Sequence, residues 1–85
     1  MNSIRVKIGV NPSVNFLNKL MNWFSSLNSI AYIETENGSR RVLAKSLIGL
    51  PSLNLKFGQI ICISFYGDYA ESDAKYIERQ IQLIV

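Results

Sequence analysis

The sequence predicts an α+β fold, an open-faced β-sandwich with the element order βαββαβα and a four-stranded antiparallel sheet whose helices lie on one face. Two observations predict it. Four short segments are predicted as strands, the first of them from its alternation of apolar and polar residues, and two longer segments repeat apolar residues every three or four positions, as amphipathic helices do. Each helix has one apolar stripe, so all helices have to cover the same face of the sheet to bury it.

The chain begins with a strand and a helix. Ile4, Val6 and Ile8 alternate with polar residues, which predicts a strand with one wet face. Asn11 is the expected N-cap of the helix, and Pro12 suits its first turn. The helix is expected over residues 13–26, with a buried stripe made of Phe16, Leu17, Leu20, Met21, Phe24 and Leu27.

Two strands joined by a hairpin follow. The first covers residues 30–35, and the alternation predicts that Ala31 and Ile33 face the core. Asn37-Gly38 is the dipeptide typical of a tight hairpin turn. The returning strand is expected over residues 40–44.

The last strand and the last helix complete the order. The strongest strand signal covers residues 59–66. One face of it carries Ile61, Ile63 and Phe65, and the other carries Ile60, Cys62, Ser64 and Tyr66. A helix is expected over about 70–84, where Ala74, Ile77, Ile81 and Ile84 form the buried stripe. Acidic residues near its start favour the helix macrodipole, namely Asp68, Glu71 and Asp73.

A serine stands in the segment 44–53, where the third strand ends and a short apolar helix, closing near Gly58, is expected. The Ser46 hydroxyl can cap that helix, and the positive field of the helix N-terminus favours an added phosphate. Arg40 and Arg41 either form a solvated strand end or contact an anion or an acidic partner beside Ser46. The serine is a candidate phosphorylation site, with the alternative that it only caps the helix.

Composition limits the classes of function. The 85 residues predict a single domain over residues 1–85. No apolar run reaches the ~20 residues of a membrane span, and the alternating N-terminus is not expected to be a signal peptide. The lone cysteine, Cys62, excludes an internal disulfide and suits the cytoplasm. Because the sequence has no histidine, histidine chemistry is excluded, and no metal or cofactor is expected.

Several motifs between Asn37 and Gly67 match one known family. The most specific is the run Ala44-Lys45-Ser46-Leu47-Ile48-Gly49-Leu50. Asn37-Gly38 and Ile61-Cys62-Ile63-Ser64 accompany it at the hairpin and the last strand. With these motifs and the element order, the chain resembles the HPr family of the bacterial phosphotransferase system. The resemblance implies one HPr-like domain and protein partners.

The resemblance also implies how the serine turn works. In the family, the serine that corresponds to Ser46 is phosphorylated by an ATP-dependent kinase/phosphorylase. The modified protein then binds a transcription regulator in carbon catabolite control. Apolar residues after the serine dock partners, so Leu47 and Ile48 are expected in the docking patch, together with Pro51, Arg40 and Arg41.

The chain departs from the family at the phosphohistidine loop. HPr proteins carry a phosphoryl group on the histidine of a Gly-aliphatic-His-small-Arg-Pro segment, but here the segment reads Gly9-Val10-Asn11-Pro12. This degenerate loop is shortened and lacks both the histidine and the arginine. An Asn amide has no lone pair basic enough to accept a phosphoryl group. The sequence therefore resembles the Crh branch, which lacks the histidine and keeps the serine, and a free-standing enzyme is not expected.

An open sheet face can also serve two other functions. An interaction or assembly module that keeps only the fold is the main alternative. It would form a homodimer through an outer sheet face made of Tyr32, Leu43, Ile60, Cys62 and Tyr66. An RNA-binding sheet needs aromatic residues on its two central strands. The first strand has Arg5 and Lys7, the third has Arg41 and Leu43, and the basic residues are otherwise scattered, so nucleic acid is not an expected partner.

Overall fold

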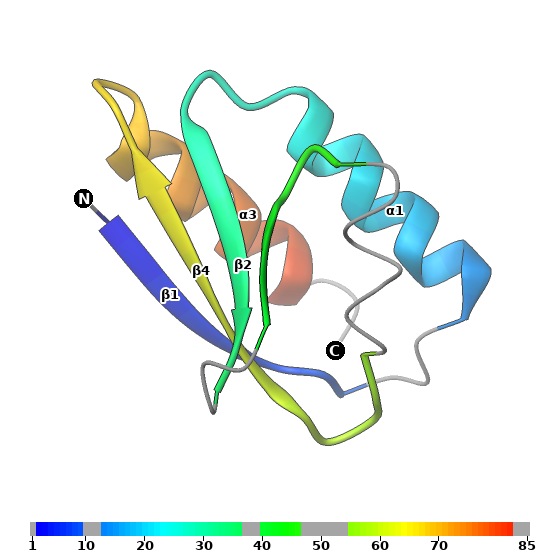
Figure 1. Cartoon of the computed structure of the whole chain (residues 1–85). Helices are drawn as coiled ribbons and strands as arrows, with labels where there is room; N and C mark the ends of the chain where they lie inside the picture. Colours follow the sequence, from blue (N-terminus) through cyan, green and yellow to red (C-terminus); the bar gives the residue numbers. More distant parts are fainter. Residues whose placement is uncertain (1, 10–12, 37–39, 47–54, 83–85) are drawn as a thin grey trace.

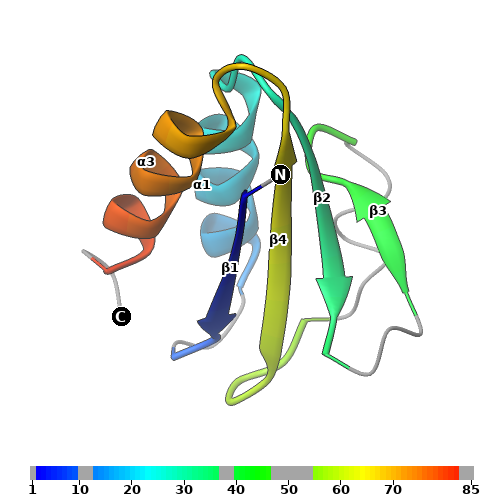
Figure 2. The same ribbon diagram turned by 90° about the vertical axis from the view of Figure 1, so that its left-hand side faces the viewer.

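The structure is a computed structural model that describes residues 2–9, 13–36, 40–46 and 55–82. Its elements are β1 (Asn2–Lys7), α1 (Val14–Ser25), β2 (Ile30–Thr35), β3 (Arg41–Leu43), β4 (Ile60–Tyr66) and α3 (Ala70–Gln82), as labelled in Figure 1. The four strands form one antiparallel sheet in the order β1-β4-β2-β3. Both described helices pack on one face of it (Figure 2), which confirms the predicted open-faced α+β sandwich.

The strand β4 is the centre of the sheet. It pairs with β1 on one side and with β2 on the other, so that Ile63 lies between Ile4 and Ile33. Its inward side chains, Ile61, Ile63 and Phe65, are at most 1% exposed. The outward side chains of β4 are only half-buried, because no described helix covers that face. The predicted division of this strand into two faces is confirmed.

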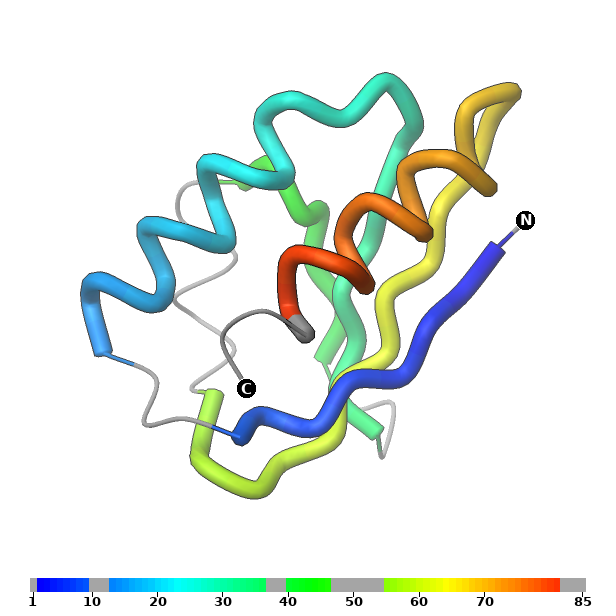
Figure 3. The backbone as a smooth tube through the Cα atoms, turned by 180° about the vertical axis from the view of Figure 1, so that it is seen from behind, coloured from blue at the N-terminus to red at the C-terminus, as the bar shows by residue number. Residues whose placement is uncertain are grey.

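The helix α1 lies beside α3 over the sheet (Figure 3). Its predicted bounds are right to within one residue, but the expected cap, Asn11, is wrong. The N-cap is Ser13, whose hydroxyl oxygen accepts a hydrogen bond from the backbone N–H of Phe16 at 3.3 Å. Serine and asparagine are about equally good caps, so local sequence alone did not separate them.

The core fills the space between the two helices and the sheet. The largest fully buried side chains are Phe24, Phe65, Ile8, Leu20, Ile33, Ile61, Ile63 and Ile77. They come from both helices, from β2 and β4, and from Ile8 just after β1, and α3 packs against β1 and β4. Neither described helix is both long enough and apolar enough to cross a bilayer.

The loop before β4 holds the end of the first strand. The Gly58 N–H donates to the carbonyl of Ile8 at 2.7 Å, and the Ile8 N–H donates to the carbonyl of Gln59 at 2.8 Å. Gly58 has a φ of 84°, a backbone conformation that favours glycine. Residues 55–59 contain this turn instead of the expected helix end, and the start of that short helix lies outside the described residues.

A buried carboxylate in the first turn of α3 binds the segment that follows α1. One oxygen of Asp73, Oδ2, accepts hydrogen bonds from the backbone N–H groups of Asn28 (3.0 Å) and Ser29 (2.8 Å) and from the Ser29 hydroxyl (2.6 Å). Asp73 is only 7% exposed. The first turn of α3 therefore holds the connection between α1 and β2, a role beyond the helix-dipole contribution that the sequence suggested.

We expect Asp73→Ala to lower the free energy of unfolding by about 2–4 kcal/mol, because the buried N–H and hydroxyl of Ser29 and the part-buried N–H of Asn28 lose their acceptor. Asp73→Asn should cost less, since a single amide oxygen can still accept these bonds. Urea unfolding followed by circular dichroism measures both changes. Glu71→Ala is the matched control: it removes an exposed acid from the same helical turn, and a loss as large as that of Asp73→Ala would contradict the assignment.

Candidate functional site

The Ser46 turn follows directly on the edge strand β3. The Ala44 N–H donates to the carbonyl of Ala31 at 2.9 Å, and the Ser46 N–H donates to the carbonyl of Leu43 at 3.1 Å. Ala44 is fully buried, whereas Ser46 is half-buried. The serine is therefore held against β2 by the backbone of the residues that precede it.

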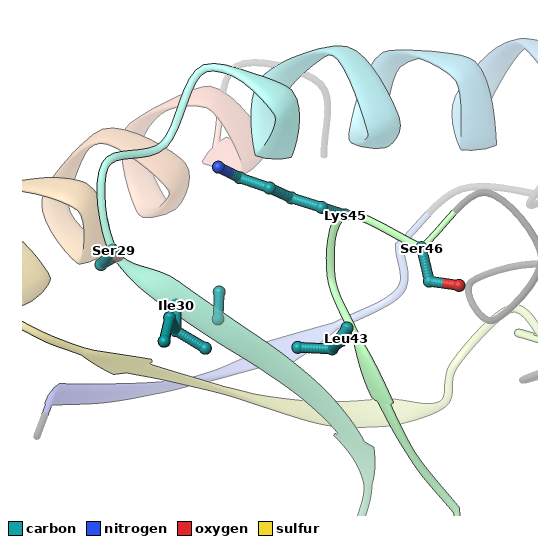
Figure 4. Close-up of a pocket in the computed structure, with 6 residues that line it drawn as sticks. Ser29, Ile30, Leu43, Lys45 and Ser46 are labelled. Atoms are coloured by element: carbon teal, nitrogen blue, oxygen red, sulfur yellow. The ribbon is translucent and has the colours of Figure 1, made fainter.

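The lysine before the serine fastens this turn to the end of α1. The Lys45 Nζ donates to the carbonyl of Leu27 at 2.8 Å, just beyond the helix. Figure 4 shows the Lys45 and Ser46 side chains pointing in opposite directions. Lys45 thus positions the turn, and its ammonium group is not directed at the serine hydroxyl.

A small groove lies beside the serine (Figure 4). It has a volume of about 280 Å³ and is lined by Ser29, Ile30, Ala31, Leu43, Lys45 and Ser46. Two of its apolar side chains are well exposed, Ile30 at 59% and Leu43 at 49%. A shallow apolar hollow of this kind suits an apolar side chain from a protein partner.

The predicted docking residues are only partly described. Leu47, Ile48 and Pro51 lie outside the described residues, as does the helix that Ser46 was expected to cap. Arg40 is bonded to Thr35 through its backbone. The Thr35 N–H donates to the carbonyl of Arg40 at 3.1 Å, and the Arg40 N–H donates to the Thr35 hydroxyl oxygen at 3.4 Å.

Arg41 points to the outer face of the sheet. Its guanidinium lies 4.3 Å from the ring centroid of Tyr32, and its Nη2 donates to the Tyr66 hydroxyl at 3.3 Å. The described contacts of the Arg41 side chain are therefore with the two tyrosines. Arg41 begins β3, whereas Ser46 follows the end of that strand. Arg41 as a contact for a partner at Ser46 stays a prediction.

The degenerate loop connects β1 to α1. Gly9 is exposed and follows Ile8, which the loop before β4 holds in place. Val10, Asn11 and Pro12 lie outside the described residues. Ser13 then caps α1, so only residues 9–12 separate these two fixed points.

The outer face of the sheet carries the side chains expected there. Tyr32, Ile60, Cys62 and Tyr66 are half-buried and Leu43 is exposed. The rings of Tyr32 and Tyr66 make an edge-to-face contact, with centroids 5.9 Å apart and planes at 81°. The predicted clustering is present, and self-association through this face stays a prediction.

The strand order corrects one argument made from the sequence. The central strands are β4 and β2, and not the first and third strands, which form the two edges. Both central strands carry a tyrosine on the outer face, Tyr66 and Tyr32. The lack of aromatic residues on β1 and β3 is therefore no argument against nucleic-acid binding.

Among the described residues, no group of three or more Cys, Asp or Glu side chains is placed to hold a metal ion. No protein-family model matches the sequence, and no curated protein matches it either.

Solved structures do match, over nearly the whole chain. HPr-C-His from Thermoanaerobacter tengcongensis superposes with a TM-score of 0.86 at 24% identity, over 96% of this chain and 92% of that one. The chain has the HPr fold. The histidine-containing phosphocarrier protein of Mycoplasma gives a TM-score of 0.80 at 19% identity, over 92% and 89% of the two chains. The phosphocarrier protein HPr from Bacillus anthracis gives a TM-score of 0.82 at 23% identity, over 95% of this chain and 96% of that one.

We expect Lys45→Met to loosen the Ser46 turn locally. The substitution keeps an apolar stem but removes the donor to Leu27, so the Ser46 amide should exchange with solvent several-fold faster, while global stability falls by less than about 1 kcal/mol. Hydrogen exchange by NMR measures the first effect. Lys19→Met, an exposed change on α1, should leave this amide unchanged, and equal exchange rates in the two variants would contradict the prediction.

Proposed function

We propose that this protein is a regulatory member of the HPr family that lacks histidine phosphocarrier capacity and acts through phosphorylation of Ser46. The observation that carries the proposal is the combination of the HPr fold with the Ala44–Leu50 motif in a chain without histidine. By resemblance to the Crh branch, its role is in carbon catabolite control in the cytoplasm.

The loss of phosphocarrier capacity follows from side-chain chemistry. A phosphoryl carrier needs a nucleophile with a basic lone pair, such as imidazole nitrogen. The segment Gly9-Val10-Asn11-Pro12 has none, because the amide of Asn11 is not basic. The protein is therefore proposed to be a target of phosphorylation and not a relay or an enzyme in its own right, and it needs no cofactor.

The environment of Ser46 suits a modification that partners recognise. The serine lies at the rim of an apolar groove with two exposed aliphatic side chains, Ile30 and Leu43. A phosphate there adds a charge of about −1.5 to −2 beside an apolar anchor point. A kinase or a regulator would bind the groove and the following residues, Leu47, Ile48 and Pro51, and a cation on the partner would distinguish the modified state.

The alternative function is an assembly module that keeps only the fold. The observation that favours it is the outer sheet face, where Tyr32, Leu43 and Tyr66 are not covered by any described helix. Such a face can bind a second copy of the chain. This alternative needs no modification of Ser46, so the phosphorylation experiment separates the two.

Incubation with an HPr kinase/phosphorylase and ATP should add one phosphoryl group to the protein, read by intact mass. Ser46→Ala should abolish the gain, because it removes the only proposed acceptor, whereas Ser72→Ala, an exposed serine on α3, should keep it. No mass gain in the unmodified chain, or a gain that persists in Ser46→Ala, would contradict the regulatory proposal.

Incubation with phosphoenolpyruvate and the enzymes that load HPr should leave the mass unchanged, since the loop after β1 has no histidine. A histidine-containing HPr protein in the same mixture is the positive control and should gain one phosphoryl group. Any acid-labile mass gain in this chain would show that another residue had taken over the role.

A further inference from the structure

We infer that the outer face of the sheet binds single-stranded nucleic acid, with Tyr32, Arg41 and Tyr66 as its stacking platform. These three residues, which we call the stacking cluster, come from three different strands of the sheet, β2, β3 and β4. This function goes beyond the role proposed for Ser46 and does not depend on phosphorylation.

The side chains of the stacking cluster are preorganised by contacts with one another. The Arg41 guanidinium is held against the Tyr32 ring at 4.3 Å and donates to the Tyr66 hydroxyl at 3.3 Å. The edge-to-face contact of the two rings fixes the tyrosines relative to each other. Arg41 is nevertheless exposed. Because bases stack both on aromatic rings and on guanidinium planes, the cluster offers an ordered surface for unpaired bases.

Cations lie at both edges of the same face. In the strand register, Arg5, Cys62, Glu34 and Arg41 form one row across the sheet. Three strand spacings separate Arg5 from Arg41, about 14 Å. Lys7 is exposed one pleat further along β1. This row lies two residues along β2 from Tyr32, about 7 Å, so phosphates that flank the stacked bases would reach Arg5 and Arg41.

The charges on this face favour a polyanion only modestly. The face carries three cations, Arg5, Lys7 and Arg41, together with two acids, Glu34 and Glu36. Glu36 forms an ion pair with Arg5. That ion pair is exposed at both side chains, so it is weak and a phosphate can compete for the guanidinium. The whole chain has a net charge of +3. Binding should therefore be weak and strongly dependent on salt.

Two other occupants fit this face less well. A second copy, related by a two-fold axis, would have to bury the cations and acids of this face together, and the desolvation cost of buried charges offsets their pairing. An acidic peptide would pair with the cations but would leave the rings of the stacking cluster without a stacking partner. Single-stranded nucleic acid supplies both phosphates and bases, and its wet interface leaves the cations hydrated.

The experiment uses fluorescence anisotropy of labelled oligouridine and oligothymidine of about 12 nucleotides. Affinity should fall with salt, with a log–log slope near −2 for three phosphate contacts at about −0.7 each. Tyr32→Ala and Arg41→Gln should each weaken binding roughly 5- to 100-fold, the range for a lost stacking contact. Arg79→Gln, which removes an exposed cation in the last turn of α3, should change affinity less than about twofold.

Conservative variants guard against loss of the fold. Tyr32→Phe and Tyr66→Phe keep both rings and should retain most of the binding, with circular dichroism showing an unchanged fold. The inference is overturned if no salt-dependent binding is seen at low salt, or if Arg79→Gln weakens binding as much as Arg41→Gln. Competition by polyglutamate as effective as that by the oligonucleotide would show an acidic-peptide site. A dimer in sedimentation that Tyr32→Ala disperses would show that a second copy covers the face.

Discussion

The strand β4 has two faces with opposite requirements, and the rest of the molecule follows from this constraint. It is hydrogen-bonded on both sides, to β1 and β2, so its backbone is fully used within the sheet. Its inward side chains, Ile61, Ile63 and Phe65, have to be covered by apolar groups. Both described helices therefore lie on that face, and the other face is left to the half-buried tyrosine and cysteine side chains.

The open face brings two candidate sites next to each other, because Leu43 of the groove pairs with Tyr32 and Ile30 pairs with Tyr66. The Ser46 turn leaves the sheet from the edge strand β3 and is held there by backbone bonds to β2 and by the Lys45 contact to Leu27. The stacking cluster lies on the open face and depends on side chains from three strands. A change at the serine can alter partner binding at the groove, because three of the side chains that line it, Ile30, Leu43 and Lys45, are exposed.

The HPr fold is formed here by a chain that contains no histidine. Nothing in the packing requires a histidine, since the first strand is fixed by Ile8 through the Gly58–Gln59 loop and α1 is capped by Ser13. Fold and chemistry are separable in this way whenever the reactive group lies on a loop between rigid elements.

The sequence by itself determined the four strands, the two described helices and the faces of the strands, because the periods of two and 3.6 residues depend only on neighbours along the chain. It also placed Ser46 at the end of the third strand. Tertiary structure decided what depends on distant residues. Asp73 accepts bonds from Asn28 and Ser29, more than forty residues earlier, and the pairing of β4 between β1 and β2 brings Tyr66 to Tyr32. Local patterns carry no information about such pairings, since strand order is chosen by packing of the whole sheet against the helices.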